Sequence, residues 1–277
     1  MVLDFYMDDV IKNAIKEDIN YIDTTADLVI PAEQRGSAYF VAKASGVLCG
    51  IDAAMRVFAL LDNTFESKVY FHDGDALQKG DVICEFEGNM RCLLKGERTA
   101  LNLIQHMSGI ATETARCVEI VKGTKAAVTD TRKTLPGLRA LQKYAVTVGG
   151  GRNHRYNLSD GAMLKDNHID ACGGITGAVN TLRSKLGHMV KIEVETRNLT
   201  EVREALEAGA DIIMLDNMDC PTMKEAVAIV GGRALLEASG GITHDTLREV
   251  AETGVDIISI GALTHSVQAF DISMRIS

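Results

Sequence analysis

Proline is scarce in this sequence, with three residues among 277, whereas glycine occurs 25 times. This balance is unlike an all-β protein with proline-rich turns, and it suits the many tight connections of an α/β protein. Apolar residues make up 46% and charged residues 24%, which excludes a collagen-like, mucin-like or disordered chain. The length accommodates one large α/β barrel or two ordinary domains.

Long apolar runs are also absent. The longest, such as Val57 to Leu61 or Ala226 to Val230, are far shorter than the roughly 18 residues that a transmembrane helix needs. The segment Met1 to Asp9 is acidic, unlike a signal or transit peptide. The six cysteines form no C-x-x-C pair, so neither a zinc site nor a disulfide framework is expected. We therefore expect a cytoplasmic protein that binds no membrane.

Positive charge is in short supply, because the net charge is −9. Such a balance argues against a protein that binds nucleic acid or anionic lipid non-specifically. The segment 132–165 is the exception, since it holds seven lysine and arginine residues and one acid, Asp160. A basic segment of this kind is either a solvated patch or an anion site. We favour the anion site because glycine turns coincide with it.

Short β-rich runs alternate with helical stretches from about residue 125 onward. Polar residues close the predicted strands at separations of 21 to 35 residues. This repeat indicates a (β/α) barrel, with a doubly wound sheet as the alternative, and both folds place functional groups at the carboxyl ends of their strands. The predicted strands are 126–129, 162–164, 190–194, 212–215, 234–237 and 257–260, closed by Asp130, Lys165, Glu195, Asp216, Ser239 and Gly261.

The first hundred residues follow another pattern and predict an α+β domain over 1–105. Helical spacing from Gly96 onward places the junction inside a helical connector near residue 105, before a barrel domain over 106–267. Apolar and polar residues alternate over 272–276, so we expect the segment 268–277 to return a half-buried strand to the first domain's sheet. In that domain the predicted helices are 7–17 and 51–61, and the predicted strands are 38–44, 69–71 and 82–86.

Cations follow the first predicted strand of the barrel. Arg132 and Lys133 come directly after Asp130-Thr131, and Pro136 is expected in the first turn of a helix after them. A strand end followed by cations and then by the start of a helix is an arrangement typical of anion-binding sites. Beyond that helix lies the segment 149–155, Gly-Gly-Gly-Arg-Asn-His-Arg. Its glycines are either a flexible loop or a place where N–H and guanidinium groups approach a carboxylate or phosphate, and the cations favour the second interpretation.

Acidic and small residues close the later strands. A buried Lys165 would need an anionic partner or ligand. Glu195 and Asp216 end successive predicted strands. Two carboxylates with no cysteine or histidine partner favour Mg²⁺ as the bound metal. Alternatively, the two acids form structural ion pairs with Lys165. The segments Ser239-Gly240-Gly241 and Gly261 to His265 match the phosphate site that barrels often form in their last two loops.

Together these motifs closely resemble the quinolinate phosphoribosyltransferases, the decarboxylating nicotinate-nucleotide pyrophosphorylases. The resemblance covers essentially residues 20 to 277, in order. The motifs that carry it are Gly96 to Asn102, Ser108 to Thr112, Asp130 to Arg139, Gly149 to Arg155, Lys165 to Ile169, Ile192 to Glu195, Leu215 to Met218, Glu237 to Ile242 and Gly261 to His265.

The resemblance implies a fold and an activity. The fold is an incomplete α/β barrel joined to an open-faced sandwich domain. The assembly is a homodimer in which the sandwich of one subunit closes the barrel of the other. The reaction joins quinolinate to phosphoribosyl pyrophosphate with Mg²⁺, releases pyrophosphate and CO₂, and gives nicotinate mononucleotide for NAD biosynthesis.

The resemblance also implies a role for each matched residue. Two basic residues, Lys133 and Lys165, would lie near the reacting centre and the pyrophosphate. Both acids, Glu195 and Asp216, would serve the ribose hydroxyls and Mg²⁺. The quinolinate carboxylates would be held by Arg132, His154, Arg155 and Lys165, with Arg98 reaching in from the partner subunit. The 5-phosphate would be surrounded by Ser239, Gly240, Gly241, Gly261 and His265.

Three alternatives stay open at this point. A molybdenum-transport-associated relative shares the Thr-Arg-Lys-Thr and His-Arg stretches, but it usually lacks the Gly-Gly-Gly-Arg-Asn-His and Lys-Asp-Asn-His forms present here. Another phosphate-binding barrel enzyme, such as an aldolase, is the second alternative. As a non-enzyme, the hairpin Leu77 to Ile83 resembles a carrier-domain turn, but no acceptor Asp-Lys pair stands at its tip.

Overall fold

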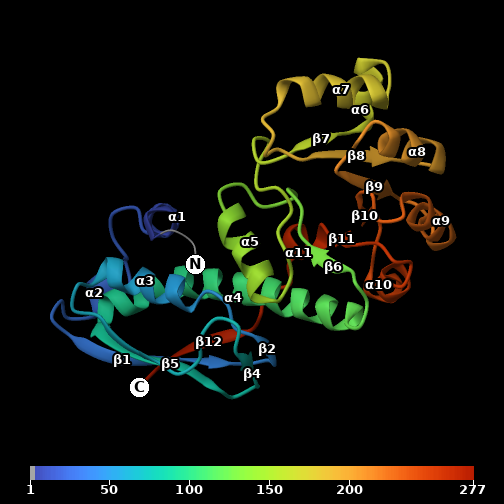
Figure 1. Ribbon diagram of the computed structural model, residues 1–277. Coiled ribbons are helices and arrows are strands. Elements are labelled where there is room, and N and C mark those ends of the chain that lie inside the picture. The colour runs from blue at the N-terminus through green and yellow to red at the C-terminus, as the bar shows by residue number, and fades with distance from the viewer. Residues whose placement is uncertain (1–3) are drawn as a thin grey trace. The chain divides into compact units, whose positions relative to one another are not determined.

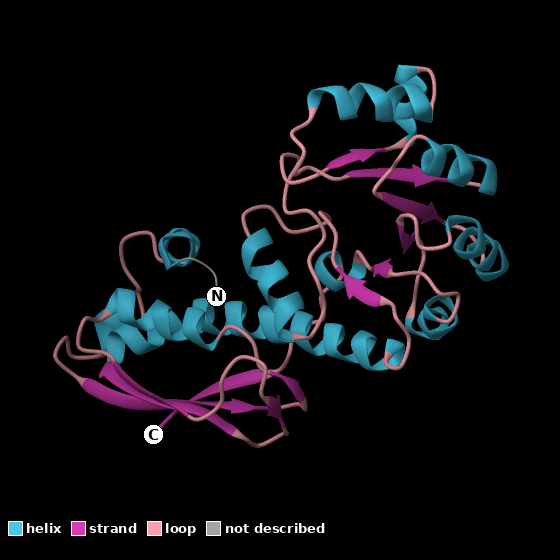
Figure 2. Ribbon diagram, in the orientation of Figure 1, coloured by secondary structure: helices cyan, strands magenta, loops and turns pink. Residues whose placement is uncertain are grey.

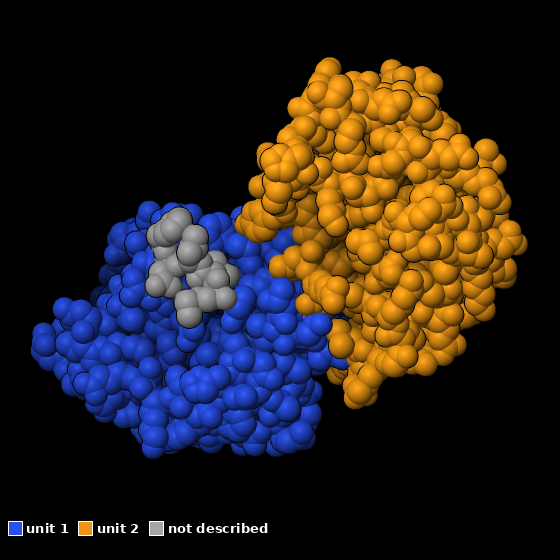
Figure 3. All heavy atoms as spheres, viewed as in Figure 1, with its two compact units in different colours: residues 1–115, 134–150, 263–277 blue, residues 116–133, 151–262 orange. Residues whose placement is uncertain are grey.

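The computed structural model describes residues 4–277, so the first three residues of the acidic segment Met1 to Asp9 lie outside the description. The chain forms two compact units (Figure 3). The first comprises residues 1–115, 134–150 and 263–277, and the second comprises 116–133 and 151–262. Among the described residues, no helix combines the length and the apolar character needed to cross a membrane.

The first unit is a four-stranded antiparallel sheet with helices on one face (Figures 1 and 2). Its strand order is β12-β1-β5-β3. The helix α3 packs Phe58 against Phe86 of β5, with ring centroids 4.9 Å apart, and Phe40 of β1 meets the same ring edge-on at 5.1 Å. These aromatic contacts fix the sheet to its helices. The elements are α1 (Asp4–Asp18), α2 (Ala26–Val29), β1 (Arg35–Ala42), β2 (Gly46–Val47), α3 (Ile51–Leu61), β3 (Glu66–Val69), β4 (Ala76–Leu77), β5 (Val82–Asn89), α4 (Met90–Val121), α5 (Arg139–Val148), α11 (Ala262–His265) and β12 (Ile272–Ile276).

The terminal strand β12 pairs antiparallel with β1, with Phe40 opposite Met274 and Ala42 opposite Ile272. Ile272 and Met274 are buried while Ser273 and Arg275 are more exposed. The alternation in the sequence therefore predicted both the strand and the sheet that it joins.

The second unit contains a six-stranded parallel sheet in the order β6-β11-β10-β9-β8-β7. The edge strands β6 and β7 are not paired with each other in this order, so the barrel is not closed, which agrees with the predicted incomplete barrel. Each strand predicted for this unit has bounds within two residues of the observed ones, whereas the first domain's predicted strands 38–44, 69–71 and 82–86 differ by three residues at one or more ends. The elements are β6 (Ala127–Thr129), β7 (Ala162–Leu164), α6 (Asp166–Cys172), α7 (Ile175–Lys185), β8 (Ile192–Thr196), α8 (Leu199–Glu207), β9 (Ile212–Asp216), α9 (Cys220–Val230), β10 (Leu235–Ser239), α10 (His244–Ala251) and β11 (Ile257–Ser259).

One predicted helix start is wrong. Pro136 does not begin a helix, because α5 begins at Arg139. Gly137 has a φ of 78°, and the Leu138 N–H donates to the Leu135 carbonyl at 3.1 Å, so residues 135 to 138 form a turn. The cations Arg132 and Lys133 are therefore not followed directly by a helix N-terminus, and their predicted anion binding has to rest on their own side chains.

Candidate active site

Strand register places the acidic residues of the second unit on one face of the sheet. Glu195 on β8 lies opposite Met214 on β9, and Asp216 follows Met214 by two residues. Ser239 on β10 lies opposite Asp216. Because side chains alternate along a strand and neighbours in register share a face, Glu195, Asp216 and Ser239 point to the same side. The parallel sheet thus brings together residues that are far apart in the sequence.

Lys165 joins this group through an ion pair. Its Nζ lies 2.9 Å from Glu195 Oε2, and the side chain of Lys165 is 48% exposed while that of Glu195 is 14% exposed. The neighbouring acid expected for this lysine is therefore present, although the lysine side chain itself is half exposed. The reason is that β7 is an edge strand, so the residue after it meets solvent on one side. The pairing with Glu195 is the alternative considered from the sequence, and it leaves the lysine accessible to an anionic ligand.

Asn217 is a residue of this site that the sequence reasoning missed. It has a φ of 52°, and it is the only non-glycine residue with positive φ in the described part of the chain. Its Nδ2 donates to Asp216 Oδ2 at 2.8 Å, and its backbone N–H donates to the Ser239 carbonyl at 2.9 Å. The strained backbone of Asn217 therefore connects the acid at the end of β9 to the glycine turn after β10.

Gly240 is required by this arrangement. Its φ is 99°, and a Cβ at this position would lie 2.2 Å from Asn217 Oδ1. Gly241 also has a positive φ, of 62°, but a Cβ there would meet nothing within 4 Å. The two glycines of the predicted phosphate loop thus serve different purposes, since only the first makes room for a neighbouring side chain.

We expect Gly240→Ala to lower the free energy of unfolding by about 3 kcal/mol, because it adds a steric conflict to a strained backbone. Gly241→Ala is the matched control and should cost only about 1 kcal/mol for the backbone alone. Urea denaturation of the two variants measures the difference. Equal losses would contradict the assigned role of Asn217.

The segment 151–155 runs between the two edge strands of the open barrel. Arg152 forms a parallel bridge with Thr129 of β6, and its N–H donates to the Val128 carbonyl at 2.8 Å. Arg155 Nη1 donates to the Gly161 carbonyl at 2.8 Å, just before β7. Contacts with both edges hold the predicted anion-binding segment in place, so it is an ordered part of the sheet's rim and not a flexible loop.

His154 extends from this segment toward two buried acids. Its backbone N–H donates to Asp130 Oδ1 at 2.9 Å. Its Nε2 lies 3.2 Å from Glu193 Oε2 and 3.5 Å from Glu237 Oε1. Glu193 and Glu237 were not predicted, although each stands two residues before a predicted site residue, so alternation on the strands β8 and β10 could have identified them.

Positive charge is concentrated around Arg155. Burial, followed by the charge of Arg132, lowers the pKa of the Arg155 guanidinium. A guanidinium group whose charge is disfavoured by burial and by a second cation indicates a place where an anion would be stabilised. Lys133 follows on the chain, and its backbone N–H donates to Thr131 Oγ1 at 3.0 Å.

Two predicted site residues, Arg98 and His265, belong to the first unit. Arg98 on α4 lines a cavity of about 610 Å³, together with Asn102 and His106 of the same helix. His265 Nδ1 lies 2.7 Å from the hydroxyl of Ser266. Gly261 belongs to the second unit, directly before α11.

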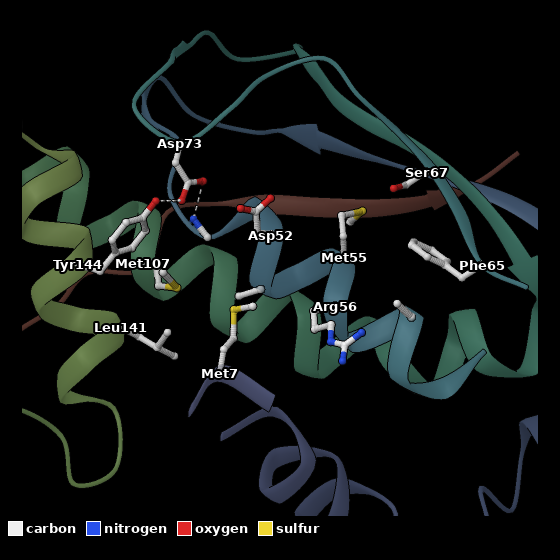
Figure 4. Close-up of a pocket in the computed structure, with 13 residues that line it drawn as sticks. Met7, Asp52, Met55, Arg56, Phe65, Ser67, Asp73, Met107, Leu141 and Tyr144 are labelled. Carbon is white, nitrogen blue, oxygen red and sulfur yellow. Dashed lines mark hydrogen bonds between the residues drawn. The ribbon is translucent and has the colours of Figure 1, made fainter. Parts of the chain in front are cut away.

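Another cavity of the first unit, of about 560 Å³, is lined by Met7, Asp73 and Tyr144 among others (Figure 4). Asp73 Oδ1 accepts the N–H groups of Gly50 and Ile51 at the start of α3, and its Oδ2 accepts the Tyr144 hydroxyl at 2.9 Å. Asp73 thus connects α3 to α5. This carboxylate has its partners within the fold, so we assign it a structural role.

Family models match almost the whole chain. Residues 23–108 match the N-terminal domain of quinolinate phosphoribosyl transferase, and residues 110–275 match its C-terminal domain. The chain belongs to the quinolinate phosphoribosyltransferase family. The prediction made from the motifs is therefore confirmed over its alternatives.

Individual relatives agree with the family. The chain is 47% identical to the probable nicotinate-nucleotide pyrophosphorylase [carboxylating] of Bacillus subtilis, over 94% of this chain and 90% of that protein. It is 41% identical to a quinolinate phosphoribosyltransferase [decarboxylating] of Nicotiana tabacum, over 97% of this chain and 81% of that protein. The crystal structure of NadC from Streptococcus pyogenes is similar with a TM-score of 0.97 at 41% identity, covering 100% of this chain and 98% of that one. These similarities extend over both units, so the family fold is present in full.

Proposed function

We propose that this chain, like the relatives named for this reaction, transfers the phosphoribosyl group of phosphoribosyl pyrophosphate to quinolinate, with decarboxylation, and so gives nicotinate mononucleotide, pyrophosphate and CO₂ for NAD biosynthesis. The observation that carries the proposal is the convergence of Lys165, Glu195, Asp216 and Ser239 at the carboxyl ends of neighbouring strands. Basic residues suit the dianionic pyridine and the pyrophosphate, whereas the acids suit a sugar that becomes cationic as its leaving group departs.

Quinolinate carries two carboxylates, and the segment after β6 and the segment 151–155 offer cations for both. In our proposal Arg132, His154, Arg155 and Lys165 hold these carboxylates, with Lys133 nearer the pyrophosphate. Guanidinium groups bind carboxylates through paired hydrogen bonds, which orients the flat pyridine ring. The 5-phosphate is proposed to bind at Ser239, Gly240, Gly241, Gly261 and His265.

The acids Glu195 and Asp216 fit a magnesium ion. They are hard oxygen donors on the same face of adjacent strands, and Asp216 is held at one oxygen by Asn217 Nδ2, which leaves the other oxygen for a ligand. Mg²⁺ is usually bound by one or two carboxylates together with substrate phosphates and waters. When bound, it would neutralise charge on the departing pyrophosphate.

The charges that develop on the substrates explain why pyrophosphate loss, attack by the pyridine nitrogen and decarboxylation follow in that order. Loss of pyrophosphate leaves positive character on the anomeric carbon of the ribose, which Glu195 and Asp216 stabilise. The pyridine nitrogen attacks with its own lone pair, so no side chain has to remove a proton from it. The alkylated ring nitrogen is then cationic beside the 2-carboxylate. It stabilises the electron pair that the broken C–C bond leaves on ring carbon 2 as CO₂ departs, and this carbon then takes up a proton from water. The chain's part in that step is to hold the ring in position.

We further propose a homodimer in the cytoplasm, in which Arg98 contributes to the partner's site. Arg98→Ala should cost about 1.5 to 3 kcal/mol of transition-state stabilisation, the range for a charge-assisted contact. The loss should appear as a decrease of about tenfold to a hundredfold in kcat/KM for quinolinate. Arg116→Ala, on the same helix, serves as the control for loss of a cation. Unchanged kinetics for Arg98→Ala would remove this residue from the site.

The direct test of the proposed function is to incubate the purified protein with quinolinate, phosphoribosyl pyrophosphate and Mg²⁺. We expect CO₂, pyrophosphate and nicotinate mononucleotide in equal amounts. Nicotinate in place of quinolinate lacks the 2-carboxylate and should release no CO₂. Absence of all three products from the complete mixture would overturn the proposal.

A further inference from the structure

Two glutamates and a histidine lie together inside the second unit, beneath the proposed quinolinate site. Glu193 on β8 is 4% exposed and Glu237 on β10 is 1% exposed. One oxygen of each, Oε1, is buried without a hydrogen-bond partner. The ligand atoms of His154, Glu193 and Glu237 all lie within 4.8 Å of one another. Two buried carboxylates this close cannot both carry charge without a large cost, so either a metal ion or a proton has to offset it.

The hydrogen bond at Nδ1, the other ring nitrogen of His154, decides between a metal ion and a proton. The N–H of Arg155 donates to His154 Nδ1 at 2.8 Å, so Nδ1 carries no proton. A neutral imidazole then has its proton on Nε2, the nitrogen that faces the two glutamates. A metal-binding histidine normally presents a bare nitrogen to the metal and donates from the other one. The ring therefore presents an N–H group towards Glu193 Oε2, 3.2 Å away, and not the bare nitrogen that a metal ion would need.

We propose that Glu237 is a positioning residue for quinolinate binding, and that it acts as a neutral carboxylic acid which, with Glu193, holds the His154 ring and the adjoining Arg155. The proposal rests on the function proposed above. Glu237 itself touches no substrate in this proposal. While it is neutral, Glu193 supplies the one negative charge beneath the cations that bind the two carboxylates of quinolinate.

The surroundings of Glu237 agree with this assignment. Burial, followed by the charge of Glu193, raises the pKa of Glu237 to about 7, although His154 and a hydrogen bond from Ser259 oppose the shift. The groups that face it are Glu193 from β8, His154 from the segment 151–155 and Ser259 from β11, while its neighbour in register on β9 is the uncharged Met214. The charge of Glu193 also acts on the Arg155 guanidinium, since it partly offsets the lowering of the Arg155 pKa by burial and by Arg132.

Ionisation of Glu237 should weaken the binding of quinolinate. As the pH rises through about 7, a second negative charge forms under the site and repels the dianionic substrate. We expect the KM for quinolinate of the wild-type protein to rise about tenfold between pH 6 and pH 8.5, because one added unit charge near the protein interior repels a like charge by an energy of about this order. Glu237→Gln keeps the shape of the neutral acid and cannot ionise, so its KM should not show this rise.

Stability supplies a readout that needs no substrate. The pKa of Glu237 is higher in the folded protein than in the unfolded chain, so its contribution to stability is present at low pH and is lost as the pH rises through about 7. We expect Glu237→Gln to have a higher Tm than the wild type at pH 8.5, and this advantage to shrink towards pH 5.

The experiment compares the wild type, Glu237→Gln and the control Glu252→Gln, an exposed glutamate paired with Arg248, in KM for quinolinate and in Tm from pH 5 to 8.5. The control should follow the wild type in both. If Glu237→Gln does not fold, Ser259→Ala takes its place; removal of the Ser259 hydrogen bond raises the pKa of Glu237, and the rise in KM should move to higher pH.

The outcomes separate the two proposals. A wild-type protein that does not turn over quinolinate contradicts the proposed function. A wild-type protein that turns it over, with a pH dependence of KM and Tm shared by Glu237→Gln, contradicts the role of Glu237 alone.

Discussion

Replacing both acids at the strand ends, by Glu195→Ala with Asp216→Ala, should lower kcat by at least about a thousandfold. In the proposed reaction each acid stabilises the positive charge that develops on the ribose, and removal of a single preorganised electrostatic group typically costs a hundredfold to a thousandfold. Both carboxylates lie on one face of adjacent strands, so they are expected to act as a unit, with losses that do not simply add.

Binding of quinolinate should survive this double substitution, because the proposed carboxylate ligands are cations. Calorimetry should therefore still detect quinolinate binding, while assays with phosphoribosyl pyrophosphate show almost no turnover. The matched control replaces two exposed acids, by Glu119→Ala with Glu252→Ala, and should keep normal activity. Loss of folding in the Glu195 and Asp216 variant would instead support a structural role for these acids.

Lys165→Ala should give the second large effect, a decrease of about a hundredfold or more in kcat/KM. The ammonium group is 2.9 Å from Glu195 Oε2 and its side chain is 48% exposed, so it can leave the glutamate for an anionic substrate. Its removal takes away a cation from the substrate and leaves Glu195 uncompensated. Lys165→Arg should not restore activity fully, because a planar guanidinium does not replace a compact ammonium.

Stability distinguishes this role from a structural one. Because the lysine side of the pair is 48% exposed, water screens the interaction, so Lys165→Ala should lower the Tm much less than it lowers kcat/KM. Lys122→Ala, which breaks the exposed pair with Glu119, is the control and should leave both activity and Tm unchanged. A large fall in Tm with little change in kcat/KM would show that the Lys165 pair serves the fold only.

Local patterns were sufficient for much of the fold. The helix over 51–61 was predicted with its observed bounds, because the spacing of its apolar residues matches the face that the helix buries. The strand at 272–276 was found from its alternation, since one face of β12 is buried and the other is not. The start of α5 was misplaced because Pro136 favours a first helical turn, whereas the positive φ of Gly137 produces a separate turn before it.

The parts of the site that were missed depend on contacts between distant segments. Asn217 looks like an ordinary polar residue after a strand, and only its contact with the position of Gly240 shows why its backbone is strained. Glu193 and Glu237 are 44 residues apart in the sequence. Alternation along each strand places them on the same face as Glu195 and Ser239, but nothing local indicates that both face His154. Their burial next to each other follows from strand order, which the sequence does not state.

The sequence by itself determined the family, the order of strands and helices along the chain, and which charged residues close the strands, because these depend on motifs and on periodicity within short segments. Tertiary structure decided which strand lies beside which, and therefore which charges meet: Lys165 with Glu195 at an accessible edge, and His154 with two glutamates in the interior. The physical reason is that the energy of a charge depends on its neighbours and on its access to water, and both are set only when the sheet forms.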